Sequence, residues 1–137
     1  MPFEELPHTA DWSLRVWAAN LNQLFCESAR GMNALTGVRL AENPRVRRTF
    51  TASAPDVENL LVSFLSELVY FADVDRLAFD HFDIHLDMEA SQPFLLSVTL
   101  HGAPILSLDK AIKAVTFHNL QIQQTPLGVE VEMVFDV

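Results

Sequence analysis

Alternating apolar and polar residues mark several short segments of the chain. Trp12, Leu14 and Val16 alternate with polar or charged neighbours, which is the two-residue period of a half-buried strand. We expect further strands over residues 3–6, 46–52, 82–88, 94–100, 115–123 and 129–135. Segments 82–88 and 94–100 flank a short polar turn, so they should pair as a hairpin.

Two longer segments repeat their apolar residues every three or four positions, which is the spacing of an amphipathic helix. The first follows Asn20, whose side chain can cap a helix, and it reaches Gly37, a residue that commonly ends one. The second follows Ser53, and Asp56 lies where a capping box has its second residue. Its apolar stripe covers residues 57–71. We therefore expect two helices, both early in the chain.

These elements predict an α+β fold. Each helix has one apolar stripe and most strands have one apolar face, so helices and strands can bury each other. We expect a two-layer sandwich, with the two helices packed on one face of a mixed sheet of about six strands. With 137 residues, half of them hydrophobic, residues 1–137 should form a single domain with a substantial core.

The composition narrows the function classes. A formal net charge of −9 disfavours a stand-alone nucleic-acid binder, which normally has a basic face. The charge fits a protein that meets a basic partner or a cation, or it serves solubility alone. The one cysteine rules out an internal disulfide, which favours a reducing compartment. No apolar run approaches ~20 residues and the first residues carry no basic segment, so we expect a cytoplasmic protein without a membrane anchor.

The standard catalytic signatures are missing from the sequence. It has no Gly-rich phosphate loop, no nucleophile elbow, no zinc-protease motif and no paired cysteines, which argues against an enzyme. One polar row attracts notice, formed by Asp83, His85, Asp87 and Glu89 at alternate positions. Alternate residues of a strand lie about 7 Å apart, too far for all four to reach one ion without another chain segment. We interpret the row as a solvated face.

The two ends of the chain carry a different combination of groups. His8 and Asp11 precede the first clear strand, Asp136 follows the last one, and Val137 carries the α-carboxylate. If the ends meet in space, one histidine and three carboxylates converge. Such oxygen ligands favour Ca²⁺, Mg²⁺ or Mn²⁺. The alternative is that Asp11 caps a turn and His8 packs beside it.

Four blocks of the sequence resemble the archease family. They are His8-Thr9-Ala10-Asp11, the segment 60–68, Ile112-Lys113-Ala114-Val115-Thr116-Phe117-His118 and Val134-Phe135-Asp136-Val137. The blocks follow the family's order from one end of the chain to the other, and the first and third are distinctive as a pair. The resemblance implies a small non-enzymatic activator of the GTP-dependent RNA-splicing ligases called RtcB. Such an activator helps the ligase, which joins tRNA halves or repairs cleaved RNA, to take up guanylate and turn over repeatedly.

The resemblance also implies a site. Family members hold a divalent cation with acids from both chain ends, which implies Asp11 and Asp136 as metal ligands and the Val137 carboxylate as a third. Ca²⁺, Mg²⁺ and Mn²⁺ are the candidate ions.

The third block implies contacts with the partner. Lys113 would face the ligase, and His8 and His118 would support the metal site or contact the partner. GTP would be used by the RtcB-type ligase and not bound here, and RNA would be met only through the ligase. Two other functions remain open on the residues alone: a metal-dependent phosphoester hydrolase, or a chaperone-like binding module.

Overall fold

The computed structural model describes residues 2–6, 12–89, 93–117 and 120–137. The helices are α1 (Leu21–Thr36) and α2 (Val57–Tyr70), and a π-helical turn, η1 (Phe71–Asp75), continues α2. The strands are β1 (Phe3–Leu6), β2 (Trp12–Ala18), β3 (Arg39–Leu40), β4 (Val46–Ala54), β5 (Leu77–Asp87), β6 (Phe94–Ser107), β7 (Ala114–Thr116), β8 (Ile122–Thr125) and β9 (Gly128–Asp136). The α+β class predicted from the sequence is confirmed.

The strands form two separate antiparallel sheets. The five-stranded sheet has the order β1-β2-β9-β7, and β8 also pairs with β9. The four-stranded sheet is centred on β6, which pairs with β3, β4 and β5. The predicted hairpin is therefore present as β5 and β6. The single mixed sheet of about six strands is not what the described residues form.

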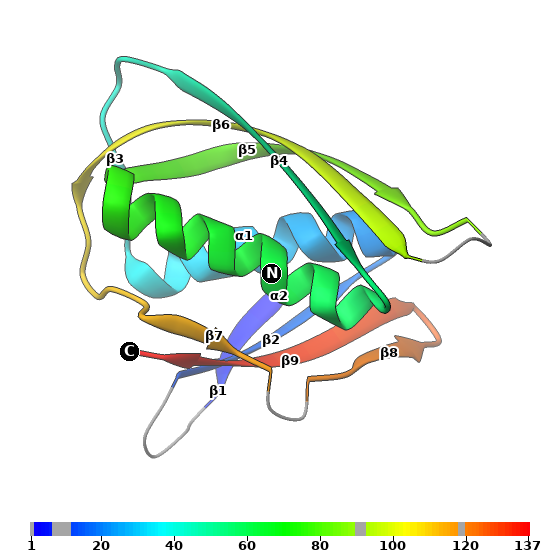
Figure 1. Cartoon of the computed structure of the whole chain (residues 1–137). Coiled ribbons are helices and arrows are strands. Elements are labelled where there is room, and N and C mark those ends of the chain that lie inside the picture. Colours follow the sequence, from blue (N-terminus) through cyan, green and yellow to red (C-terminus); the bar gives the residue numbers. More distant parts are fainter. Residues whose placement is uncertain (1, 7–11, 90–92, 118–119) are drawn as a thin grey trace.

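Both helices lie between the two sheets (Figure 1). In α1, the Asn33 side chain donates to the Phe79 carbonyl of the four-stranded sheet at 2.8 Å. Gly31, on the same helix, lies against Leu14 of the five-stranded sheet. Helix α2 contacts both sheets too. Glu58 accepts a hydrogen bond at 3.1 Å from the backbone N–H of Ile122 in the five-stranded sheet, and Phe64 packs on Phe82 of the four-stranded sheet. Each sheet thus has one face on the helices and one face away from them.

The core fills the space between these layers. Phe64 of α2 is fully buried, stacks on Phe25 of α1 with ring centroids 5.9 Å apart, and meets Phe82 of β5 edge-to-face at 6.0 Å. Such aromatic pairs add to the burial of their large apolar surfaces. The buried positions of α2 are Leu60, Leu61, Phe64, Leu65 and Leu68. These residues cover enough of the helix surface to contact both sheets, so α2 packs against the two layers at once.

The helix caps follow the sequence prediction in α1 but not in α2. Asn20 accepts a hydrogen bond from the Gln23 N–H at 2.9 Å, and Gly37 ends the helix with a left-handed φ of 63°. In α2 the cap is Asp56, which accepts from the Asn59 N–H at 2.7 Å. The prediction of Ser53 as the cap is wrong because Ser53 is held extended in β4 by its pairing with β6.

Two strand predictions also need correction. Strand β6 extends to Ser107, beyond the end of the predicted strand 94–100. The strand predicted over 115–123 is instead two short strands, β7 and β8, which pair with different parts of β9.

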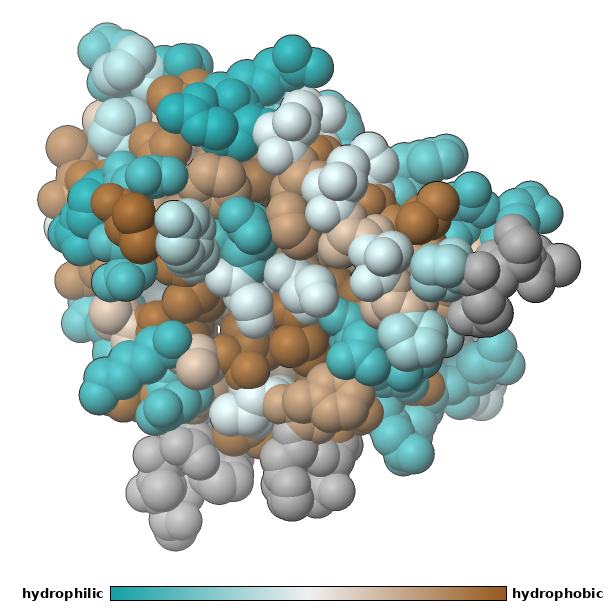
Figure 2. Space-filling view, viewed as in Figure 1, coloured by the Kyte–Doolittle hydropathy of each residue, from teal (hydrophilic) through white to brown (hydrophobic). Residues whose placement is uncertain are grey.

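Hydrophilic residues gather at the upper end of the molecule, where β4 begins (Figure 2). No helix in the described part of the chain is both long and apolar enough to cross a membrane.

Candidate functional site

The antiparallel pairing of β2 with β9 places the start of β2 beside the end of β9. Trp12, which follows Asp11 in the sequence, pairs with Phe135, which precedes Asp136. The residue that follows Asp11 therefore lies opposite the residue that precedes Asp136, and the convergence of the acids themselves stays a prediction. Asp11 itself lies outside the described residues, as do His8 and His118.

Asp136 ends β9 with its side chain exposed to solvent. Its backbone is fixed on the other side by β7, because Ala114 pairs with Asp136 and the Lys113 N–H donates to the Asp136 carbonyl at 2.7 Å. The side chain of Val137 is partly buried and packs against the core. The carboxylate of Asp136 thus projects from a backbone that is held by a neighbouring strand and anchored by the next residue.

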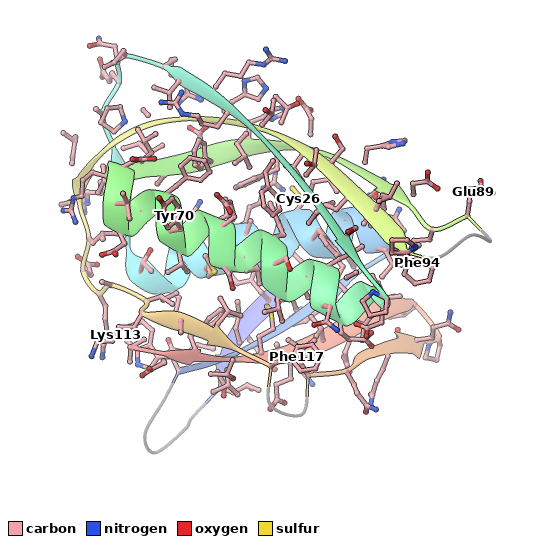
Figure 3. The ribbon with its side chains drawn as sticks, in the orientation of Figure 1. Cys26, Tyr70, Glu89, Phe94, Lys113 and Phe117 are labelled. Atoms are coloured by element: carbon pink, nitrogen blue, oxygen red, sulfur yellow. The ribbon has the colours of Figure 1, made fainter. Side chains whose placement is uncertain are left out.

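Two lysines lie close to this end of β9. Lys113 is exposed and precedes β7, on the side of the molecule where the C-terminus lies (Figures 1 and 3). The ammonium of Lys110 sits 4.3 Å from the centroid of the Trp12 ring, a cation–π contact. The backbone N–H of Lys110 donates to the Thr36 carbonyl at 3.2 Å, which ties the segment to the end of α1. We call the group Trp12, Lys110, Lys113, Asp136 and Val137 the chain-end site.

The chain-end site combines a carboxylate with cationic side chains at a solvent-exposed surface. The carboxylate is a hard oxygen donor of the kind that Ca²⁺, Mg²⁺ and Mn²⁺ accept. The lysines could contact phosphate or acidic groups of a partner. Sequence reasoning singled out Lys113 and Asp136 but gave no role to Lys110 or Trp12. Only their contact in space links them, so no local signal in the sequence could have found the pair.

The single cysteine does not contribute to this site. Cys26 lies on α1 and packs against the core, and burial raises the pKa of its thiol, opposed by the nearby charge of Arg30. The thiol is therefore protonated near neutral pH.

The comparisons with known proteins agree over almost the whole chain. The sequence matches the archease protein family (MTH1598/TM1083) over residues 3–137. The protein archease of Methanosarcina barkeri is 30% identical over 140 residues, which cover 98% of this chain and 95% of the relative. The protein archease of Pyrococcus furiosus is 28% identical over 131 residues, which cover 92% of this chain and 91% of the relative.

Solved structures share the fold. The solution structure of Methanobacterium thermoautotrophicum protein 1598 has a TM-score of 0.80 and 25% identity, and 99% of each chain is covered. The crystal structure of a Thermotoga maritima protein, described as an archease and possible chaperone, has a TM-score of 0.68 at 18% identity, with 98% of this chain and 96% of the other covered. None of these names denotes a catalytic activity. With the family matched from residue 3 to residue 137, this chain belongs to the archease family.

Proposed function

We propose that this chain activates a GTP-dependent RNA ligase of the RtcB type and promotes the ligase's guanylylation and repeated turnover. The observation that carries the proposal is the pairing of Trp12 with Phe135, within a chain that matches the archease family from end to end. Asp11 and Asp136 are the sequence neighbours of these two paired residues. The family resemblance implies acids at those positions as the functional site.

A divalent cation is proposed to bind at this site. The carboxylates of Asp11, Asp136 and Val137 would coordinate it, with Ca²⁺, Mg²⁺ or Mn²⁺ as the ion. The donor set supports this choice, because Asp136 is exposed on a backbone fixed by the Lys113 N–H, and its oxygens suit hard cations. A bound cation would supply positive charge that stabilises phosphoryl oxygens.

Charge supports the choice of partner. A ligase that binds RNA phosphates and GTP needs a basic active-site entrance, and a chain with a net charge of −9 would be attracted to it. Lys113 and Lys110 would then contact acidic or phosphate groups near that entrance. His8 and His118 are proposed as supporting residues for the metal site or for partner contact.

The test is ligation of a cleaved RNA by a limiting amount of the cognate ligase, with GTP and Mn²⁺, in the presence and absence of this protein. We expect many turnovers per ligase only when the protein is added. RNA that is not ligated, with a ligase shown separately to be active, would contradict the proposal. Turnover of phosphoesters by the isolated protein would instead favour the metal-dependent hydrolase, and suppression of aggregation of unrelated proteins would favour the chaperone-like module.

A matched pair of variants tests the site within the same assay. Asp136→Asn removes one charge from the end of β9, and Glu132→Gln removes one charge from an exposed position of the same strand. The first should abolish most of the stimulation, while the second should leave it within about twofold, because an exposed charge away from a site has a small effect. Equal loss in both variants would assign the effect to net charge alone.

A further inference from the structure

A second group of ligand-type side chains lies on the four-stranded sheet, far along the chain from both ends. His81 and Asp83 are exposed on β5, where they flank the buried Phe82. Because Phe82 packs on Phe64 of α2, His81 and Asp83 point to the sheet face away from the helices. His101 of β6 pairs directly with His81 and shares that face. We call His81, Asp83 and His101 the histidine–aspartate cluster.

A β-bulge sets the position of His81 in this cluster. The register between β5 and β6 shifts between Phe79 and His81, which leaves Asp80 without a partner on β6. Asp80 is bound instead by Arg45, the residue just before β4, with two nitrogen–oxygen distances of 2.7 and 3.0 Å. The bulge brings His81 opposite His101, so two imidazoles lie side by side on neighbouring strands.

The distances in the cluster are those of groups that can share an ion. The Nε2 atom of His81 is 3.2 Å from Oδ1 of Asp83, and the Nε2 atom of His101 is 3.3 Å from Oδ2 of Asp83. The two imidazole rings are tilted by 54° with centroids 5.3 Å apart. Each residue offers a ligand atom within 4.8 Å of the others. Among the described residues, this is the one group of His, Cys, Asp or Glu side chains that meets this condition.

We propose that the histidine–aspartate cluster binds a late first-row divalent cation, with Zn²⁺ as the best match. Imidazole nitrogen suits Zn²⁺, Ni²⁺ and Cu²⁺, whereas Ca²⁺ and Mg²⁺ prefer oxygen. Ligand atoms about 2.0–2.1 Å from a tetrahedral Zn²⁺ lie about 3.3 Å from one another. Each histidine nitrogen lies at about that spacing from one oxygen of Asp83, His81 from Oδ1 and His101 from Oδ2, so a small rotation of the carboxylate would bring one oxygen to a shared ion. Three protein ligands leave the fourth position open to water.

The surroundings of the cluster oppose strong binding but permit access. The side chains of His81 and Asp83 are 62% and 61% exposed, and that of His101 is 34% exposed, so a cation can reach all three from solvent. On the other side of β6, Arg47 of β4 pairs with His101. Its positive charge weakens cation binding. This inference is independent of the proposed ligase function, because the two sites share no residue.

Isothermal titration of the whole protein with ZnCl₂, after dialysis against a chelator, tests the proposal. We expect one Zn²⁺ per chain, and His101→Ala should weaken its affinity at least about tenfold, as loss of a metal-site partner does. His85→Ala is the matched control, because His85 is exposed on the same strand as Asp83 but outside the cluster. It should change the affinity less than about twofold. Equal affinity in wild type and His101→Ala would overturn the proposal.

A second variant keeps the test informative if His101→Ala folds poorly. Arg47→Gln removes the opposing charge, and at low ionic strength it should strengthen Zn²⁺ binding about fourfold, as Coulomb's law gives for a divalent ion and a unit charge ~10 Å apart in water. A misfolded protein cannot produce such a gain. Titration with CaCl₂ is the accompanying control for ion selectivity. Loss of Ca²⁺ binding in a His101→Ala protein whose circular dichroism spectrum and thermal melt match wild type would mean that the cluster is not a separate site, and would overturn the proposal.

Discussion

The two sheets carry two candidate cation sites of different construction. At the chain-end site, Asp136 belongs to the last strand, and the acid expected beside it, Asp11, precedes the second strand. The histidine–aspartate cluster comes from two consecutive strands that pair as a hairpin. The first site would bind its ion through the proposed carboxylates of Asp11, Asp136 and Val137, and the second through two imidazoles and one carboxylate. The two proposals thus give the same chain one site for hard cations and another for softer ones.

The comparison shows how distance along the chain affects what a sequence reveals. The chain-end acids are far apart in sequence, yet the family resemblance predicts them as a pair. The ligands of the histidine–aspartate cluster lie within 21 residues of the chain, 81–101, but family blocks do not cover them. They become visible only when the register of β5 and β6 is known. Proximity in sequence is therefore no guide to how easily a site is recognised.

The largest expected effect is the loss of Ca²⁺ affinity in Asp136→Asn, a variant that distinguishes the two sites. This variant should reduce Ca²⁺ affinity by at least about 10–100-fold, which is the cost of losing even an outer partner of a metal ligand. It should also abolish most of the ligase stimulation. Zn²⁺ binding should stay within about twofold of wild type, because the histidine–aspartate cluster lies on the other sheet. Calorimetric titration with each ion, on the same preparation, makes the measurement.

The reciprocal variant completes the comparison. His101→Ala should lose Zn²⁺ affinity and keep both Ca²⁺ affinity and ligase stimulation. If Asp136→Asn weakened both ions equally, the two sheets would not carry separate sites. If His101→Ala reduced ligase stimulation, the four-stranded sheet would belong to the partner interface.

A smaller effect is expected from Gly102→Ala, which acts on the bulge beside the histidine–aspartate cluster. A Cβ atom at Gly102 would lie 1.9 Å from the Ala78 carbonyl oxygen and 2.7 Å from the Phe79 Cα. These are backbone atoms, so β5 must move away from β6. We expect a loss of about 1–3 kcal/mol in the free energy of unfolding, as for other overpacked sites, together with weaker Zn²⁺ binding. Urea unfolding and calorimetric titration measure the two effects.

The control for this variant lies on the same strand. Ser97→Ala changes an exposed residue of β6 that pairs with His85, and it should alter the free energy of unfolding by less than about 0.5 kcal/mol. Ca²⁺ binding at the chain-end site should survive in both variants. A Gly102→Ala protein as stable as wild type, with unchanged Zn²⁺ affinity, would show that the bulge does not position His81.

The elements that the sequence predicted well are those fixed by local interactions. The cap of α1 depends on Asn20 and Gln23, three residues apart, and its end depends on the left-handed conformation of Gly37. Ser53 was assigned wrongly because its conformation depends on pairing with Leu95, which is distant in the sequence. The two-sheet arrangement was missed for a related reason. The alternating pattern of a strand with one apolar face does not show whether the strands of a chain form one sheet or two.

The same distinction applies to the sites. The row formed by Asp83, His85, Asp87 and Glu89 was predicted as a solvated face, and the exposure of Asp83, His85 and Glu89 agrees. According to the same prediction, residues of this row could share an ion only with the help of another chain segment. Strand β6 is that segment, because its His101 lies beside Asp83. The bulge at Asp80 shifts which residues of β5 and β6 face each other. It leaves no periodic signal in the sequence.

The smallest expected effect concerns the ion pair that binds the bulge. Arg45 donates two hydrogen bonds to Asp80, and these hold the pKa of the Asp80 carboxyl below its ordinary value of 3.8, with burial acting in the opposite direction. Because the folded protein binds this proton less readily than the unfolded chain does, the pair stabilises the fold above that ordinary value. The stabilisation is lost as the pH falls through the lowered pKa of the folded state.

Arg45→Met therefore tests the ion pair through its pH dependence. At pH 6 the variant should melt at most about 2–3 °C below wild type, because the side chains of the pair are about half exposed and well screened. At pH 2.5 the difference should shrink, since Asp80 becomes increasingly protonated in both proteins. Thermal melts followed by circular dichroism across this range make the measurement. A difference in Tm that stays constant between pH 6 and pH 2.5 would assign the effect to the packing of the Arg45 side chain, so the bulge would be held without its charge.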